Sequence, residues 1–389
     1  DVYKRQCFGC GAGGNVITFL MEYENYTFPE ALEVLANRIG VELPKQELSA
    51  EQKRASDKKA RLLEANKEAA KYFYTLLRSE RGSRAHEYFK NRGLSEKTLQ
   101  KFGLGYSDKY SDDLYRYLRT KGYEDELLKD SGLVSIDEQR GGYDKFWNRA
   151  MFPIMDVRGK VIGFGGRVMG DGEPKYLNSP ESEIYHKSRT LYGIYFAKKS
   201  IVQHNRCYLV EGYLDVISFH QKGIENTVAS SGTSLTIEQI RLIRRLTPNV
   251  TIIYDGDAAG IKASLRGIDL VLEEGWNVRV VSLPDGEDPD SYAQAHTAEE
   301  VLEFISGHET DFIHFKTKLL LTQAGSDPIE RAKLITDIVR SISLIPDTIT
   351  RSVYVQETAN QMKVEEKLLY NEIARIRKEK VGDPIPLPY

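Results

Sequence analysis

Short apolar runs and amphipathic segments alternate between residues 206 and 283, and this alternation constrains the fold more than any other feature of the chain. We predict strands at 207–210, 227–229, 250–254 and 278–281, and helices at 213–221, 236–246 and 258–274. Alternation of strands and helices at this spacing predicts a parallel sheet with right-handed crossovers. Ligands of such a sheet bind beyond the carboxyl ends of its strands.

Acidic residues follow three of these predicted strands. They are Glu211 and Asp215 after the first strand, Asp255 and Asp257 after the third, and Asp288 and Asp290 after the fourth. One such cluster alone is ordinary turn chemistry, but three of them share one edge of the predicted sheet. Carboxylate oxygens are the ligands that Mg²⁺ prefers, so we predict that this edge holds one or two divalent cations. Asp215 has an alternative role as a first-turn acid, which the helix dipole favours.

The length of 389 residues and the changes in composition along the chain predict several domains of mixed α+β and α/β class. The segments that we expect are a glycine-rich piece at 1–44, a charged and solvated helical linker at 45–71, an α+β region at 72–205, an α/β region at 206–291, a helical region at 292–380 and a proline-rich tail at 381–389. The α/β region is the one with the predicted parallel sheet, so it is expected to carry the cation site.

The charge balance and the cysteine count narrow the class of protein. Basic residues number 54 and acidic residues 57, so the net charge of −3 does not point to nucleic acid, and any such partner must meet a local basic patch. Three cysteines and the lack of a signal-peptide pattern predict a reducing cytoplasm. No run of roughly 18 apolar residues indicates a membrane segment.

Cys7 and Cys10 have the spacing of half a zinc site. A closed structural zinc site needs four ligands, and no histidine precedes His86 in the sequence. A redox role for the pair is the alternative, but no thioredoxin-like strand and helix pattern surrounds it. The pair thus supplies two of the four ligands, and because the chain does not begin with Met we expect the sequence to be truncated.

Many short motifs of the chain resemble one known family. The motifs are Glu211-Gly-Tyr-Leu-Asp215, Asp255-Gly-Asp257, Phe152-Pro-Ile154, Gly163-Phe-Gly-Gly-Arg167, Lys175-Tyr-Leu-Asn-Ser-Pro-Glu181, His186-Lys187, Leu191-Tyr-Gly193, Ser230-Ser-Gly-Thr-Ser234 and Leu283-Pro-Asp-Gly-Glu-Asp-Pro-Asp290. The first two resemble the TOPRIM fold, which primases, topoisomerases and some nucleases share. Together the motifs resemble the bacterial replicative primases of the DnaG type, from Cys7 to about Lys380.

The resemblance implies an activity and a set of site residues. The activity is DNA-directed RNA polymerisation: a primase that makes short RNA primers from ribonucleoside triphosphates on a single-stranded DNA template for replication, with Mg²⁺ or Mn²⁺. Glu211, Asp255 and Asp257 are implied as the catalytic metal-binding acids, with Asp215, Asp288 and Asp290 as additions. Residues implied to contact template or nucleotide are Arg149, Arg167, Lys175, Asn178 and Lys187.

The resemblance also implies a zinc-binding domain and a helicase partner. The family has a further Cys-x-x-His pair upstream of the position of Cys7, so the resemblance implies that Cys7 and Cys10 are the second half of a zinc ribbon whose first half is missing. We therefore expect the chain as given not to bind Zn²⁺ through Cys7 and Cys10 alone. A C-terminal domain that binds the replicative helicase follows the polymerase core in the family. We expect that domain to lie beyond Tyr389, and we expect no membrane partner.

Two other functions compete with the primase interpretation. The first is another TOPRIM enzyme, a topoisomerase or nuclease, which would use the same acids to cut or rejoin strands. The second is an inactive module that binds DNA or docks a helicase. Glu211, Asp255 and Asp257 argue against the second, because a module that only binds DNA gains nothing from acids that repel phosphate.

Overall fold

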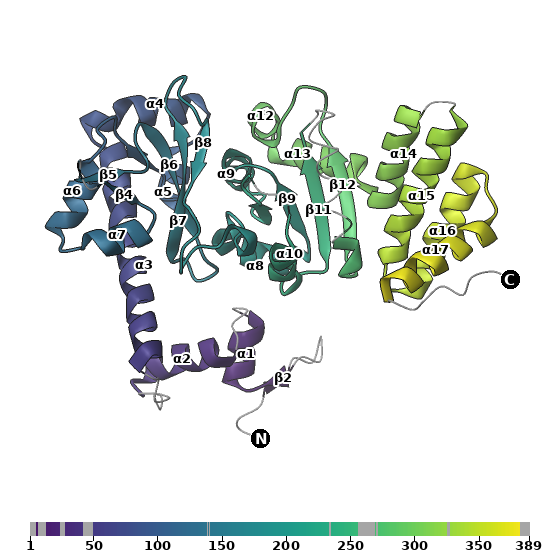
Figure 1. Cartoon of the computed structure of the whole chain (residues 1–389), viewed down its shortest axis with the longest axis horizontal. Helices are drawn as coiled ribbons and strands as arrows, with labels where there is room; N and C mark the ends of the chain where they lie inside the picture. The colour runs from purple at the N-terminus through teal and green to yellow at the C-terminus, as the bar shows by residue number, and fades with distance from the viewer. Residues whose placement is uncertain are drawn as a thin grey trace.

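The computed structural model of the chain describes residues 5–6, 13–23, 28–41, 50–137, 139, 141–232, 235–255, 269, 271–324 and 327–381. Figure 1 shows a mixed helix and strand part, a sheet flanked by helices and a group of helices in a row, with the first two helices lying apart. Among the helices that the structure describes, none has both the length and the apolar character that a membrane span requires.

The N-terminal piece contains a two-stranded antiparallel ladder and two helices. Its elements are β1 (Arg5–Gln6), β2 (Gly13–Gly14), α1 (Val16–Tyr23) and α2 (Phe28–Ile39). Helix α1 begins directly after Asn15, and Phe28 opens α2. Helix α2 ends before Gly40, whose φ of +69° favours glycine.

A single long helix, α3 (Ala50–Leu77), connects this piece to the rest of the chain. We predicted a solvated linker as far as residue 71, and this is wrong for its second half. Leu62, Ala65, Ala69 and Phe73 are all buried. These positions recur at helical spacing and form one apolar stripe, but the alanines among many charges gave a weak signal in the sequence.

The part that follows packs helices around a four-stranded antiparallel sheet, which we call the first sheet. Its strand order is β3-β6-β7-β8, and β4 pairs with β5 in a separate ladder. The elements are η1 (Glu80–Gly82), α4 (Ser83–Asn91), α5 (Glu96–Lys101), β3 (Gly105–Ser107), α6 (Asp113–Thr120), α7 (Asp125–Asp130), β4 (Val134–Asp137), β5 (Gly141–Asp144), β6 (Arg149–Met155), β7 (Val161–Val168), β8 (Tyr176–Asn178) and η2 (Lys187–Arg189). The predicted α+β class of this region is confirmed.

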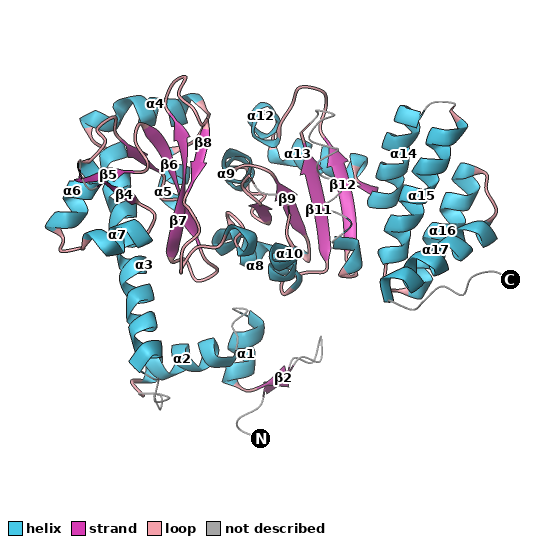
Figure 2. Cartoon of the chain, in the orientation of Figure 1, coloured by secondary structure: helices cyan, strands magenta, loops and turns pink. Residues whose placement is uncertain are grey.

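The central sheet has the order β10-β9-β11-β12-β13, and the ladders among its first four strands are parallel. Its elements are α8 (Ile194–His204), β9 (Cys207–Val210), α9 (Tyr213–Gln221), β10 (Thr227–Ala229), α10 (Ile237–Arg244), β11 (Asn249–Tyr254), β12 (Asn277–Ser282), α12 (Pro289–Ala295) and α13 (Ala298–His308). The predicted parallel α/β sheet is confirmed (Figure 2). Most of the helix predicted at 258–274 lies outside the described residues.

The C-terminal region is helical, as predicted, with one exception. The strand β13 (Thr310–Asp311) pairs antiparallel with β12 and adds an edge to the central sheet. Two residues are too few for a sequence pattern to reveal a strand. The helices are α14 (Phe312–Ala324), α15 (Pro328–Leu344), α16 (Thr348–Met362) and α17 (Glu366–Val381), and the expected proline-rich tail beyond them lies outside the described residues.

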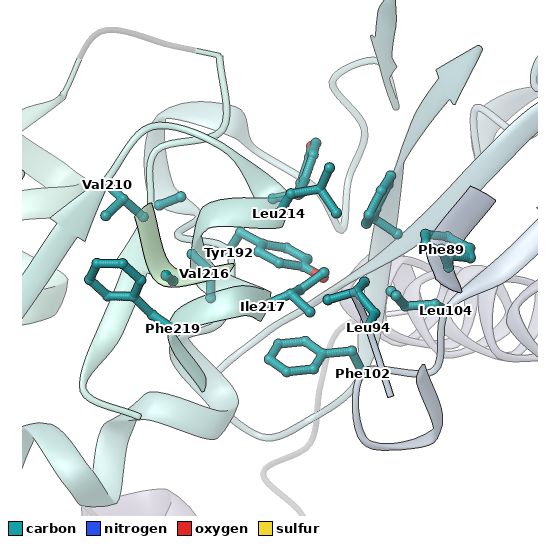
Figure 3. Close-up of a cluster of buried hydrophobic side chains, with 14 of the residues drawn as sticks. Phe89, Leu94, Phe102, Leu104, Tyr192, Val210, Leu214, Val216, Ile217 and Phe219 are labelled. Atoms are coloured by element: carbon teal, nitrogen blue, oxygen red, sulfur yellow. The ribbon is translucent and has the colours of Figure 1, made fainter. Parts of the chain in front are cut away.

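One hydrophobic core joins the first sheet to the central sheet. Phe89, Phe102 and Leu104 from the first part lie in the same buried cluster as Val216 and Phe219 of α9 (Figure 3). Each of these side chains is at most 1% exposed. Because protein interiors are close-packed, a core that both parts share fixes their relative position.

His220 of α9 lies at this junction and is 4% exposed. Its Nε2 lies 2.9 Å from the Thr227 carbonyl oxygen, and its ring meets Phe102 edge-on with 5.3 Å between centroids. Burial lowers the pKa of His220 from 6.5 to about 4; nearby Lys101 also lowers it, while the Thr227 carbonyl and Glu225 oppose the shift. The neutral ring, donating from Nε2 to Thr227, is therefore the form that fits the junction.

We expect the chain to lose stability as the pH falls from 6.5 to 4. The unfolded chain takes up a proton on His220 in this window and the folded chain does not, so stability present above pH 6.5 is lost on acidification. The loss reaches about 3 kcal/mol in the free energy of unfolding. Urea unfolding at pH 7 and pH 4 measures it, with His220→Gln as a variant that keeps an N–H donor and should show a shallower decline. Equal declines in both proteins would contradict the prediction.

Candidate metal site and nucleic-acid surface

Glu211 and Asp255 follow neighbouring parallel strands of the central sheet. In the β9–β11 ladder Leu209 is paired with Ile252. Carrying this register onward places Glu211 beside Tyr254, the residue before Asp255. Glu211 is exposed and Asp255 is half-buried. The two carboxylates therefore lie at the same edge of the sheet, as the sequence predicts.

Asp215 lies in the first turn of α9 and is buried, with Oδ2 accepting a 2.8 Å hydrogen bond from the Gly212 backbone N–H. Burial raises the pKa of Asp215 to about 7. The Gly212 N–H opposes the rise, and the negative charges of Asp255, Asp288 and Asp290 add to it. These negative charges act together on Asp215, and a bound cation would relieve their repulsion.

Asp288 is the N-cap of α12, and its Oδ1 accepts a 2.7 Å hydrogen bond from the Ser291 backbone N–H. We call the carboxyl end of the central sheet with Glu211, Asp215, Asp255 and Asp288 the acidic edge. Asp257 lies outside the described residues. Within the described part of the chain, no three Asp, Glu, His or Cys side chains already form a cation cage. The donors are all carboxylates, with Glu211 exposed and Asp255 and Asp288 half-buried, and this chemistry fits a hard divalent cation.

Asp290 is placed differently from the other acids. It is 2% exposed, and both its carboxylate oxygens accept hydrogen bonds from side chains. Oδ1 accepts from Ser218 Oγ at 2.5 Å and from Gln294 Nε2 at 2.7 Å. Oδ2 accepts from Arg92 Nη1 at 3.1 Å. These partners do not support the ligand role that we expected for Asp290.

Asn178 connects the first sheet to the acidic edge. Its Oδ1 accepts a 2.7 Å hydrogen bond from the Tyr213 hydroxyl, and its Nδ2 donates at 3.0 Å to the carbonyl of Ser231. The Ser231 N–H in turn donates to the Glu211 carbonyl at 3.1 Å, and Ser231 has a φ of +57°. Asn178 therefore holds the loop beside Glu211, a structural role that we did not foresee when we predicted contact with template or nucleotide.

A cationic cluster lies on the first sheet and on the end of α4. Arg167 lies over the ring of Tyr88 at 4.8 Å, and Arg92 lies over the same ring at 5.9 Å. Lys175 is exposed just before β8, and in the β7–β8 ladder Arg167 is paired with Tyr176. We call Arg92, Arg167 and Lys175 the cationic cluster. Guanidinium groups beside aromatic rings suit contact with phosphates and bases.

The other two predicted cations lie elsewhere. Arg149 is 6% exposed, and its Nη1 donates to the carbonyls of Gly166 at 3.1 Å and Pro174 at 2.9 Å. Its position inside the sheet does not support the phosphate contact that we predicted. Lys187 is half-buried in η2, where its carbonyl accepts from Gln239 Nε2 at 3.0 Å. Its backbone thus ties η2 to α10.

Sequence reasoning missed Arg92 and Tyr88. Neither belongs to a motif that we recognised, and Arg92 is 198 residues from its partner Asp290. Contacts of Arg92 and Gly93, the residues that follow α4, with α12 and α9 bring these groups together. Cys7 and Cys10 lie outside the described residues, so their role as two ligands of an incomplete zinc site remains a prediction.

Family models match most of the chain. The model described as "DNA primase catalytic core, N-terminal domain" matches residues 72–198, and the one described as "Toprim-like" matches residues 208–293. The model described as "CHC2 zinc finger" matches residues 2–51. The Toprim-like and zinc-finger matches indicate metal binding in general.

A fourth family model corrects one expectation. The model described as "DnaB-helicase binding domain of primase" matches residues 315–366, within the C-terminal helices. We expected a region of this description only beyond the end of the chain, and that expectation is wrong. The helical pattern of 315–366 gave no sign of a binding role.

Relatives that match nearly the whole chain are DNA primases. The chain is 38% identical over 377 residues to the DNA primase of Clostridium acetobutylicum, with 96% of the chain and 61% of that protein covered. It is 39% identical over 382 residues to the DNA primase of Halalkalibacterium halodurans, with 97% and 63% covered. The chain thus spans about three fifths of the length of these relatives.

Solved structures of primase domains have the same fold. A DNA primase domain from Pseudomonas aeruginosa superposes with a TM-score of 0.73 at 34% identity, covering 81% of this chain and 99% of that one. A DnaG primase catalytic domain bound to ssDNA superposes with a TM-score of 0.73 at 35% identity, covering 80% and 99%. The chain belongs to the DnaG family of bacterial DNA primases.

Proposed function

We propose that this chain is the polymerase core of a primase, which makes short RNA primers on single-stranded DNA for replication in the cytoplasm. The observation that carries the proposal is the direct connection between the acidic edge and the cationic cluster. Asn178 ties β8 to the loop beside Glu211, and Arg92 of the cluster pairs with Asp290, two residues after Asp288. A polymerase needs a cation site and a phosphate-binding surface next to each other, because the phosphates of the bound nucleotide are also the groups that react.

In the proposed reaction the 3′-hydroxyl of one nucleotide attacks the α-phosphate of the next. A bond from that oxygen to phosphorus forms, the bond to the bridging oxygen breaks, and pyrophosphate leaves. Glu211, Asp255 and Asp257 are proposed to hold Mg²⁺ or Mn²⁺, with Asp215 and Asp288 in support. When bound, such cations lower the pKa of the hydroxyl and stabilise the charge on the leaving oxygens.

The cationic cluster is proposed to bind the template and the incoming nucleotide. Arg167 and Lys175 would contact phosphates, while the exposed Tyr176 offers a ring face on which a base can stack. Lys187 is a further candidate at the η2 turn. The cluster explains how a chain of net charge −3 can bind DNA, because the acidic edge cancels its charge in the total.

The domains and remaining partners are proposals as well. We propose a zinc-ribbon region at 1–44, a linker at 45–71 whose second half packs on the polymerase core, core parts at 72–205 and 206–291, and a helical part at 292–380. Cys7 and Cys10 are proposed to be zinc ligands, and both lie in the region that matches the CHC2 zinc-finger family. The region that matches the helicase-binding family, 315–366, is proposed to contribute to contact with the replicative helicase.

Incubating the chain with single-stranded DNA, all four ribonucleoside triphosphates and Mg²⁺ or Mn²⁺ tests the proposal. We expect short RNA products that depend on template, on ribonucleotides and on the cation, resolved on a denaturing gel. Reactions with EDTA, or without template, serve as controls. Nicking or relaxation of supercoiled DNA without use of ribonucleotides would contradict the proposal and favour another Toprim enzyme. An absence of any product at high protein concentration would favour a module that only binds.

A further inference from the structure

The carboxylate of Asp290 is saturated by the protein itself. Ser218 of α9, Gln294 of α12 and Arg92 between α4 and α5 donate to its two oxygens at 2.5, 2.7 and 3.1 Å. Its side chain is 3% exposed, whereas that of Arg92 is 37% exposed. A buried carboxylate is stable only when it is paired and hydrogen-bonded, and here both conditions are met.

This arrangement disfavours a cation at Asp290. A divalent ion bound to Oδ2 would have to displace the Arg92 guanidinium or lie close to its positive charge. Binding through Oδ1 would break the contacts with Ser218 and Gln294. Asp288, in contrast, is half-buried, and among the described residues its side chain accepts one hydrogen bond, the cap from the Ser291 N–H. The two acids of the Asp-Pro-Asp sequence therefore have different surroundings.

Asp290 also determines where Asp288 lies. Helix α12 begins at Pro289 and has Asp288 as its N-cap, so the helix carries both acids. The contact with Ser218 fixes this first turn against α9, the helix that carries Asp215. A shift of α12 would move Asp288 relative to the acidic edge.

Arg92 extends the contact into the cationic cluster. It lies over the Tyr88 ring that Arg167 also covers, and Tyr88 is on α4. Next to Arg92, the Gly93 carbonyl accepts a 2.8 Å hydrogen bond from Gln221 Nε2 at the end of α9. The end of α4 is thus held from two sides, by Asp290 and by Gln221.

We propose that Asp290 is a positioning residue and not a cation ligand. Through the ion pair with Arg92 it holds α12, and with it Asp288, at a fixed position relative to the cationic cluster. The surface that binds nucleic acid and the acidic edge therefore stay aligned. The alignment matters only for the proposed polymerase reaction, and to that extent this inference rests on the proposed function. The placement of Asp290 outside the cation site does not depend on it.

A double-mutant cycle with two readouts tests the proposal. The variants are Asp290→Asn, Arg92→Gln and the double variant, and Mn²⁺ binding is followed by the loss of the free-ion signal in electron paramagnetic resonance. We expect Asp290→Asn to leave the Mn²⁺ dissociation constant within about twofold of the unchanged chain, while primer synthesis falls by at least about tenfold through misplacement. The rate of primer synthesis in the double variant should be no more than about twofold below that of either single variant, because the two residues act as one unit.

Two further variants make the outcome decisive. Asp255→Asn should weaken Mn²⁺ binding, which shows that the assay detects a lost ligand. Ser218→Ala removes one hydrogen-bond donor to Asp290 and leaves the ion pair with Arg92 in place. It should reduce primer synthesis less than Asp290→Asn does, and it serves as the test variant if Asp290→Asn folds poorly. Weaker Mn²⁺ binding in Asp290→Asn, or a double variant equal to the product of the single losses, overturns the proposal. If Asp255→Asn also binds Mn²⁺ normally, the proposed cation site is wrong. The ion pair between Arg92 and Asp290 is then tested by the unfolding free energies of the same variants. Non-additive free energies support the pair as one unit, and additive ones overturn it.

Discussion

Replacing Asp255 by asparagine is expected to abolish primer synthesis and leave the fold intact. Asp255 follows β11 at the carboxyl end of the central sheet, where the register places it near Glu211. Asparagine has nearly the same shape but no charge, so it can fill the site and cannot hold a divalent cation well. Cations at such sites contribute several kcal/mol of charge stabilisation in the transition state, and the loss corresponds to roughly 10³-fold in rate.

The rate of RNA synthesis at saturating Mg²⁺ measures this effect, and circular dichroism checks the fold. Asp285→Asn is a matched control, because Asp285 is an exposed acid in the loop after β12 and its replacement changes the net charge equally. We expect the control to retain activity within about threefold, as surface substitutions usually do. An Asp255→Asn chain with full activity would remove Asp255 from the site. Equal losses in both variants would mean that the charge of the whole edge matters and not this carboxylate.

Replacing Gly165 by alanine is expected to cause a large loss of stability. Gly165 lies in β7, where an added Cβ would meet ring atoms of Tyr213 at 2.5 Å and the Tyr213 hydroxyl at 2.6 Å. The ring cannot move away easily, because it stacks on Phe152 with 5.2 Å between centroids and its hydroxyl donates to Asn178. Overpacking of a buried site costs about 3 kcal/mol in the free energy of unfolding.

Urea unfolding of the two proteins measures this difference. Gly307→Ala provides a control of opposite sign, because Gly307 lies in α13 and an added Cβ there meets no atom within 4 Å. Alanine in a helix is favoured over glycine, so this variant should be more stable by about 0.5–1 kcal/mol. A stable Gly165→Ala chain would show that the Tyr213 ring has room to move. It would also weaken the inference that the close contact of Gly165 in β7 with Tyr213 in α9 helps to fix the relative position of the two sheets.

The central sheet could be predicted from the sequence in some detail. The predicted ranges 213–221 and 227–229 coincide with α9 and β10, because each combines a clear apolar period with a turn signal at its ends. The C-terminal edge strand β13 and the burial of the second half of α3 could not be predicted in the same way. Strand β13 is too short to show an alternating apolar pattern. The burial of α3 depends on alanines, which are buried only where another part of the chain packs against them.

The acids of the candidate site illustrate the same limit. Their order after the strands was sufficient to place Glu211 and Asp255 at one edge, since parallel strands end on the same side. It was not sufficient to separate Asp288 from Asp290, which belong to one turn of chain. Their difference arises from Arg92, which is far away in the sequence.

The sequence by itself determined the strand and helix order, the edge at which the acids gather and, through its motifs, the family. These are local or periodic properties, and short stretches of chain specify them. Tertiary structure alone decided that Asn178 and Asp290 bind protein groups, that Arg149 is buried, and that Arg92 and Tyr88 join the cationic surface. Each of these results depends on contacts between residues distant in the chain, and such contacts exist only after the two sheets pack on their common core.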